Sequence, residues 1–344
     1  MGETLSAPPG PRMSDPPPPD ALADMYHLML VTMLADKKSV AEAKAGRLQA
    51  AFYPVRGMEA VCAALGDVLR PEDRLVSTYR NLGDALAKGV PLRSIMAELY
   101  GRVEGTSRGK GGPMHLQDQS VGFTATTGVV GSGLPIGVGL AMAAQLDGKG
   151  SATVVTFGDG ATSIGAYHEA MNFAALWRLP VVLLCQNNQW GEHTKIADYA
   201  PSTDLAGRAA AYTIPTERVD GFDPMACREA IGRAVERARR DEGPTFLECV
   251  SYRLTGHTGT ADFSYVPKDE LEAALKRDPA PSFRTWLTAN ALLPEERIVD
   301  IENAAERYVE DAFEYAQSCA FPPPEELYTD VFADDSWVRS ISDE

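Results

Sequence analysis

The fold is decided by the stretch from Gly158 to Asn188, which reads GDGATSIGAYHEAMNFAALWRLPVVLLCQNN. Two apolar runs, 152–157 just before this stretch and 181–186 near its end, are rich in Val and Leu without alternation, as expected for parallel strands buried on both faces. Pro180 separates the second run from a segment whose apolar residues recur at helical spacing, at Ile164, Tyr167, Met171, Ala174 and Ala175. The stretch therefore predicts a strand, a helix and a second, parallel strand.

Polar residues follow both predicted strands. A right-handed βαβ unit brings Asp159 and Asn188 to the carboxyl edge of the sheet, where open α/β folds bind ligands. Carboxylate and amide oxygens suit Mg²⁺ or Ca²⁺, and Mg²⁺ usually completes its shell with phosphate oxygens and water. The pattern thus predicts a magnesium-bound diphosphate. Gly158 and Gly160 would let the backbone approach it, and the amides of Gly160 and Ala161 are expected to begin an anion-favouring helix.

The GDG triplet, the helix and the Asn pair together resemble the thiamine diphosphate binding motif. The interior EAMNFAALWRLPVV and the following NNQWG are similar to the alpha subunit of the 2-oxo acid dehydrogenases, and the resemblance covers residues 48–267. It implies that Asp159, the Asn188 side chain and the backbone carbonyl of Trp190 hold Mg²⁺, while Gly160 and Ala161 contact the diphosphate. The alternative is a tight glycine turn with a helix-capping Asp and a turn-forming Asn pair.

Other segments point to the same ligand. Tyr79 and Arg80, in STYRNLG, combine a phenol with a guanidinium, which suits directed hydrogen bonds to phosphate. The resemblance places diphosphate ligands at these positions, whereas the alternative for Arg80 is a surface residue. Gly128 and Val130 match positions whose backbone holds the aminopyrimidine ring in the family. The run GKGGPMH at 109–115 resembles a loop near the cofactor.

His257 is the candidate catalytic residue. It follows the strand-like TFLECVSY and lies in a loop rich in Gly and Thr, where a histidine can act as an acid, a base or a phosphate contact. The family has a histidine here near the reacting thiazolium carbon. His27, His168 and His193 have no such context, and we interpret them as structural or solvated.

Two positions depart from the pyruvate type of the family. When GMEA at 57–60 is aligned with the family's GQEA, Tyr53 stands where pyruvate and acetoin enzymes carry histidine, and Leu82 replaces a second histidine. A less polar pocket wall favours a bulkier or more apolar acyl group than that of pyruvate.

The resemblance and the pattern of elements predict an α/β thiamine-diphosphate-binding fold with a mostly parallel sheet and helices on both faces, of the diphosphate-binding type. We expect one domain over 21–330, with helical flanks at 21–51 and 268–317. The Pro-rich segment 1–20 is expected to be disordered or extended, and 331–344 to form an acidic tail.

Composition bounds the setting. The formal net charge of −16 argues against nucleic acid, which requires a basic footprint. The five cysteines show no zinc spacing, no run approaches a membrane span, and the first twenty residues resemble neither a transit peptide nor a signal peptide. We therefore expect a cytoplasmic protein with reduced cysteines.

The resemblance also implies partners. Thiamine enzymes need a glutamate against the pyrimidine ring, and in this family a separate beta subunit supplies it. The expected protein is the alpha subunit of an α2β2 enzyme that decarboxylates a 2-oxo acid, or cleaves acetoin, and passes the acyl group to a lipoyl acyltransferase. Two alternatives remain: a split transketolase-like or acyloin-forming enzyme, and a thiamine-binding scaffold subunit without catalysis.

Overall fold

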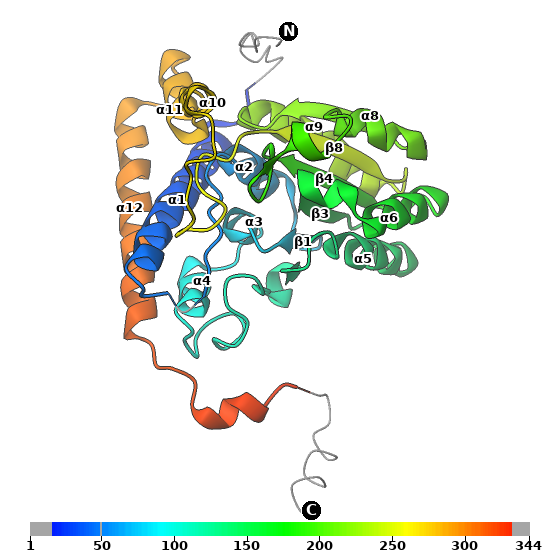
Figure 1. Cartoon of the computed structure of the whole chain (residues 1–344). Coiled ribbons are helices and arrows are strands. Elements are labelled where there is room, and N and C mark those ends of the chain that lie inside the picture. The colour runs from blue at the N-terminus through cyan, green and yellow to red at the C-terminus, as the bar shows by residue number, and fades with distance from the viewer. Residues whose placement is uncertain (1–15, 49, 332–344) are drawn as a thin grey trace, which may run out of the picture.

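A computed structural model of the chain describes residues 16–48 and 50–331 (Figure 1). Most of the predicted Pro-rich arm, residues 1–15, and nearly all of the predicted acidic tail, residues 332–344, lie outside the described residues.

The centre of the fold is a six-stranded sheet in which all paired strands are parallel. The two predicted strands, β3 (Thr153–Gly158) and β4 (Val181–Asn187), are neighbours in the middle of the order β2-β1-β3-β4-β8-β7. A short antiparallel pair follows β4, and the predicted α/β class is confirmed. The other strands are β1 (Arg74–Thr78), β2 (Phe123–Thr127), β5 (Trp190–Gly191), β6 (Thr194–Lys195), β7 (Thr216–Asp220) and β8 (Thr245–Val250).

Helices cover both faces of the sheet. Successive residues of a strand point to opposite faces, and in the central strands the residues on both faces are mostly apolar. Val154 packs in the cluster that contains α2 (Glu59–Val68) and α9 (Pro224–Arg239). Its neighbour Val155 packs in the cluster formed by α5 (Gly133–Asp147) and α6 (Gly165–Leu176). At Gly137 of α5 an added Cβ would lie 2.0 Å from Val155, so glycine is required for this close approach of helix and strand.

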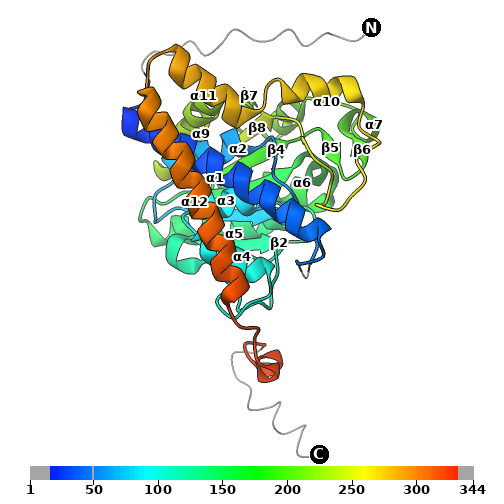
Figure 2. The same ribbon diagram turned by 90° about the vertical axis from the view of Figure 1, so that its left-hand side faces the viewer.

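The two predicted helical flanks pack against each other outside α2. Figure 2 shows α12 (Glu295–Ser318) crossing α1 (Pro19–Lys44). The prediction of a helix over 21–51 was too long, because the chain turns at Gly46 with a φ of 72°. The predicted flank 268–317 is divided into three helices, since prolines stand at or just before the starts of the second and third. The remaining helices are α3 (Leu82–Ala87), α4 (Leu92–Leu99), α7 (Ile196–Tyr199), α8 (Leu205–Ala209), α10 (Lys268–Leu275) and α11 (Pro279–Ala289).

The prediction that an α-helix begins at Gly160 and Ala161 was wrong. Residues Asp159–Ser163 form a 3-10 turn, and Ile164 is extended with φ −100° and ψ 158°. Helix α6 begins only at Gly165, so the amides of the GDG turn are not the first amides of an α-helix.

Two features of composition can be located in the described part of the chain. The five cysteines are free, and Cys62, Cys185, Cys227 and Cys249 are buried. Within residues 16–48 and 50–331, no helix combines the length and the apolar character needed to cross a membrane.

Candidate functional site

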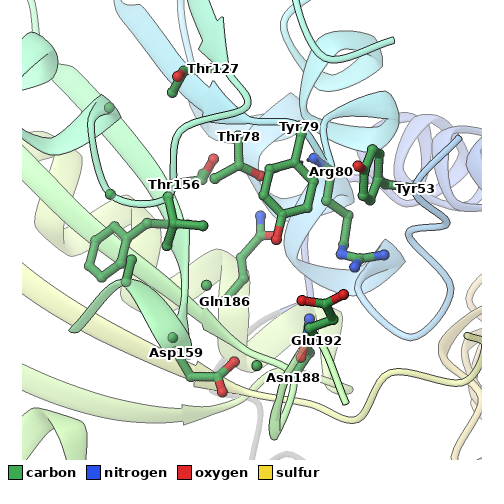
Figure 3. Close-up of a pocket in the computed structure, with 18 of the residues that line it drawn as sticks. Tyr53, Thr78, Tyr79, Arg80, Thr127, Thr156, Asp159, Gln186, Asn188 and Glu192 are labelled. Atoms are coloured by element: carbon green, nitrogen blue, oxygen red, sulfur yellow. Dashed lines mark hydrogen bonds between the residues drawn. The ribbon is translucent and has the colours of Figure 1, made fainter. Parts of the chain in front are cut away.

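A cavity of about 410 Å³ opens at the carboxyl ends of β1, β3 and β4. Figure 3 shows Thr78, Tyr79 and Arg80 on the opposite side of this cavity from Asp159 and Asn188. All of the candidate site residues from the sequence line it, namely Tyr79, Arg80, Gly128, Val130, Gly158, Asp159, Gly160, Ala161, Asn188, Trp190 and His257. Residues from segments far apart in the chain therefore converge on one space.

Asp159 and Asn188 lie together because β3 and β4 pair in parallel with Gly158 opposite Gln186. Both side chains are buried, Asp159 at 1% and Asn188 at 5% exposure. The hydroxyl of Tyr199 donates to Asp159, and the backbone N–H of Trp190 donates to Asn188 Oδ1 over 3.2 Å. Burial raises the pKa of Asp159, while the hydrogen bond from Tyr199 lowers it.

Arg80 is a buried cation on the opposite wall. Its guanidinium donates to the carbonyl of Pro54 and, over 3.3 Å, to the carbonyl of His257. Burial lowers the pKa of Arg80 to about 10, so the side chain still carries its charge at neutral pH. A buried positive charge in the wall of the cavity fits an anionic ligand there.

His257 is held neutral. Burial, together with the positive charges of Arg80 and Arg253, lowers its pKa to about 4. Arg80 Nη2 lies 3.4 Å from His257 Nδ1, an arrangement that favours the tautomer with its hydrogen on Nε2. The ring also packs 5.3 Å from that of Tyr53 and 6.0 Å from that of Tyr79, centroid to centroid. At neutral pH the imidazole therefore carries its one ring hydrogen at Nε2, where it can donate a hydrogen bond.

The two departures from the pyruvate type have different structural consequences. Tyr53 lines the cavity, and its ring lies 4.5 Å from that of Tyr79. Leu82 is not among the described residues that line the cavity. It begins α3, is 2% exposed, and packs in the core cluster with α1 and α2. The interpretation of Leu82 as part of the pocket wall was therefore wrong, because the helix start turns this side chain into the core.

Several residues of the site were missed from the sequence. Gln186 and Thr156 line the cavity, and both are polar residues within strands that otherwise read as apolar, which was the available signal. Arg253 is fully buried just after β8 and donates to the carbonyl of Glu192 over 2.6 Å. The signal that could have identified Arg253 is its position as a charged residue just after a buried strand. Nothing in the local sequence marks Tyr199 as the partner of Asp159.

The donor set fits a magnesium-bound diphosphate. An added Cβ at Gly158 would meet no atom within 4 Å, so the backbone there is open to the cavity. Among the described residues, no cluster of three or more His, Cys, Asp and Glu side chains could hold a metal. A cation bound between Asp159 and Asn188 would thus need additional oxygen ligands, which a diphosphate and backbone carbonyls can provide.

The loop at 105–116 supports the wall of the cavity and is organised by one buried carboxylate. Glu98, at the end of α4, accepts backbone N–H groups at 2.8 to 2.9 Å. Met114 of this loop lies 3.1 Å from where a Cβ on Gly128 would stand. The donors to Glu98 are the amides of Ser107, Gly109, Gly111 and Gly112.

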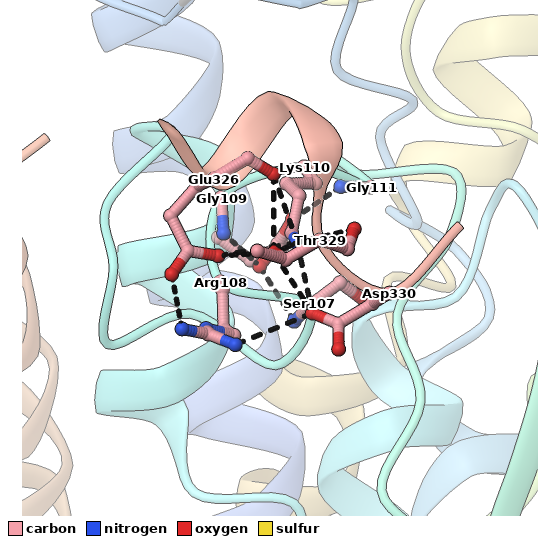
Figure 4. A network of polar contacts seen from close by, with 9 residues as sticks. Ser107, Arg108, Gly109, Lys110, Gly111, Glu326, Thr329 and Asp330 are labelled. Carbon is pink, nitrogen blue, oxygen red and sulfur yellow. Dashed lines mark hydrogen bonds and ion pairs between the residues drawn. The ribbon is translucent and has the colours of Figure 1, made fainter. Parts of the chain in front are cut away.

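The segment that follows α12 forms ion pairs with the outer side of the same loop. Figure 4 shows Glu326 and Asp330, in and just after the 3-10 helix η4 (Pro324–Tyr328), against Arg108 and Lys110. Lys110 Nζ lies 2.9 Å from Asp330 Oδ2 and 3.2 Å from Glu326 Oε2, and Arg108 pairs with both carboxylates. Each of these exposed ion pairs contributes little to stability, but together they hold the segment around η4 against the loop.

We expect Glu98→Gln to lower the free energy of unfolding by about 2 kcal/mol, because the new NH₂ group faces backbone N–H groups that lose their acceptor. Urea denaturation monitored by circular dichroism measures this change. Glu104→Gln, at an exposed position nearby, is the matched control and should stay within about 0.5 kcal/mol of wild type. Equal stability of the two variants would show that Glu98 does not organise the loop.

Fold and site together define a class of protein: an α/β protein with a ligand-binding cavity at the carboxyl edge of a parallel sheet. Residues 26–325 match the family model described as Dehydrogenase E1 component, and the chain belongs to this family.

Named relatives agree with this assignment. The chain is 37% identical over 278 residues to the alpha subunit of acetoin:2,6-dichlorophenolindophenol oxidoreductase from Bacillus subtilis (strain 168), an alignment that covers 80% of this chain and 83% of the relative. It is 36% identical over 276 residues to the pyruvate dehydrogenase E1 component subunit alpha of Rhizobium meliloti (strain 1021), covering 80% and 79%. The human mitochondrial somatic form is 36% identical over 281 residues, covering 81% and 71%. The chain is thus an alpha subunit of a thiamine-diphosphate-dependent dehydrogenase.

Proposed function

We propose that this chain, together with a beta subunit, binds magnesium thiamine diphosphate and catalyses oxidative decarboxylation of a 2-oxo acid, or cleavage of acetoin, with transfer of the acyl group to a lipoyl acyltransferase. The observation that carries the proposal is the convergence of the candidate residues on one cavity. The names of the relatives, which include both an acetoin and a pyruvate enzyme, support this range of substrates.

In this proposal the chain anchors the tail of the cofactor. Asp159, Asn188 Oδ1 and the carbonyl of Trp190 would hold Mg²⁺, and the charged guanidinium of Arg80 and the hydroxyl of Tyr79 would contact the diphosphate. The support is the buried donor set at the open GDG turn and the retained charge of Arg80. Gly128 and Val130, which line the same cavity, would position the aminopyrimidine ring through their backbone groups.

When bound, thiamine diphosphate supplies the carbon nucleophile and the electron sink of the reaction. The protein's part is orientation and proton transfer. His257 would hold a proton at Nε2 toward the substrate, because its ring is neutral at pH 7 and Arg80 faces Nδ1. Tyr53, packed against Tyr79, would narrow the space left for the acyl group.

The beta subunit would complete the cavity. Its described lining contains the carboxylates Asp159 and Glu192, and Glu192 is exposed. Since Asp159 is assigned to the metal, we infer that the glutamate needed against the pyrimidine ring comes from the partner, in an α2β2 assembly. The free cysteines fit a reducing compartment, and we infer a cytoplasmic location.

Co-expression with a beta subunit tests the proposal. We expect the complex, and not the isolated alpha chain, to reduce an artificial dye acceptor when supplied with magnesium, thiamine diphosphate and one substrate from a panel of pyruvate, acetoin, branched-chain 2-oxo acids and 2-oxoglutarate. The chain alone, assayed at the same concentration, is the control. Tight cofactor binding and decarboxylation by the isolated chain would contradict the shared site.

A further inference from the structure

A buried carboxylate lies behind the cavity wall and has no part in the proposed metal or diphosphate contacts. Asp84, on α3, is 2% exposed and accepts hydrogen bonds from side chains of three neighbouring strands. The donors are Ser77 Oγ at 2.6 Å, Thr156 Oγ1 at 2.6 Å and Gln186 Nε2 at 3.0 Å. Cys62 Sγ lies 3.7 Å from the same carboxylate.

This cluster decides which end of the Gln186 amide faces the cavity. The NH₂ group of Gln186 points toward Asp84, which is the orientation that an ionised carboxylate requires, since it can only accept hydrogen bonds. Burial raises the pKa of Asp84, while the hydrogen bonds from Ser77, Thr156 and Gln186 lower it. The amide oxygen is then the end left for the cavity, which Gln186 lines (Figure 3). Among the hydrogen bonds of the described residues, none is donated to this oxygen, although the amide is otherwise fixed.

We propose that Asp84 is a positioning residue that presents the Gln186 carbonyl oxygen to the bound ligand, so that the site selects a hydrogen-bond donor at this point. The inference rests on the proposed function. An N–H or O–H group can come from two sources: the amino group of the cofactor's aminopyrimidine, or a hydroxyl of the substrate or its adduct. An acceptor in the same place would face the lone pairs of Gln186 without a proton between them.

Gln186→Met is the first test, because methionine has a similar length and cannot accept a comparable hydrogen bond. In the alpha–beta complex we expect a loss of about tenfold in one of two measurements. If the donor is the cofactor, the Kd of thiamine diphosphate measured by calorimetry with magnesium rises. If the donor is the substrate, that Kd is unchanged and the KM for acetoin or a 2-oxo acid rises.

Asp84→Asn tests whether Asp84 acts through Gln186. Asparagine can donate as well as accept, so the Gln186 amide is free to turn, and we expect part of the loss seen in Gln186→Met. In the double variant, Asp84→Asn should add no further loss, because the acceptor is already gone. Gln145→Met is the control, since Gln145 Nε2 also donates to a carboxylate, that of Asp241 at 2.9 Å, but does not line the cavity, and it should leave both measurements unchanged.

The outcomes separate this inference from the proposed function. Wild-type complex that binds no thiamine diphosphate would overturn both. Wild-type complex that binds it, with equal Kd and KM in Gln186→Met, would overturn only the role of Gln186. If Asp84→Asn weakens binding as much in the Gln186→Met background as in wild type, Asp84 does not act through Gln186 and has only a structural role. If Asp84→Asn does not fold, as thermal unfolding would show, Gln186→Met alone decides whether a donor is selected.

Discussion

We expect the Asp159→Asn variant of the alpha–beta complex to bind magnesium thiamine diphosphate more than about a hundredfold more weakly than wild type, because loss of a ligand should exceed the 10- to 100-fold cost of losing a ligand's partner. The substitution removes the negative charge that attracts Mg²⁺ while keeping the shape of the side chain. The new amide can still accept the hydrogen bond from Tyr199 through its oxygen, so the fold should be retained. Calorimetric titration with the cofactor at fixed magnesium measures the effect.

Asp198→Asn is the matched control, since Asp198 lies on the neighbouring helix α7 and is exposed. It removes the same charge without touching the cavity, and its affinity should equal that of wild type. Equal affinity of Asp159→Asn and Asp198→Asn would contradict the assignment of Asp159 to the metal. If a higher magnesium concentration partly restores the cofactor affinity of Asp159→Asn, the assignment of Asp159 to the metal is supported, because mass action can compensate for a weaker cation site.

The sequence could predict the sheet edge because the evidence for it is local. The apolar run before Asp159 and the one before Asn188 each mark a buried strand, and the helical period between them fixes the crossover. Parallel pairing then brings both strand ends to one edge, so two residues far apart in the sequence become neighbours. The resemblance to a known family added His257, Tyr79 and Arg80, which no local pattern would have joined to the same cavity.

The sequence could not predict contacts whose partners lie on unrelated segments. Glu98 holds a loop that begins several residues later, but many carboxylates in the chain could have done so. The same holds for Asp84, whose hydrogen bond with Gln186 joins side chains 102 residues apart in the sequence. The error at Leu82 has the same origin: the alignment located the residue two positions after Arg80, while the turn into α3 directed its side chain into the core.

The His257→Ala variant should slow acyl transfer to a lipoyl substrate by about a hundredfold, the lower range for loss of a positioned acid or base. Cofactor affinity should change much less, because Arg80 and Asp159 remain. The low pKa of His257 gives a second signature. Between its folded value of about 4 and its ordinary value of 6.5, the unfolded chain binds more protons. The stability that neutral His257 contributes is therefore complete above pH 6.5 and is lost as pH falls toward 4.

The two signatures distinguish a role in proton transfer from a role in packing. His257 contacts the rings of Tyr53 and Tyr79, so a purely structural histidine would also cost stability when removed. Stopped-flow measurement of acyl transfer separates the cases, since only a proton-transfer residue slows that step with saturating cofactor. In His257→Ala the free energy of unfolding should also decrease less as the pH is lowered from 6.5 to 4, because the imidazole is absent. His168→Ala is the control, because His168 is exposed and bonded to Tyr212 on another part of the fold. Unchanged acyl transfer in His257→Ala would assign the histidine to packing alone.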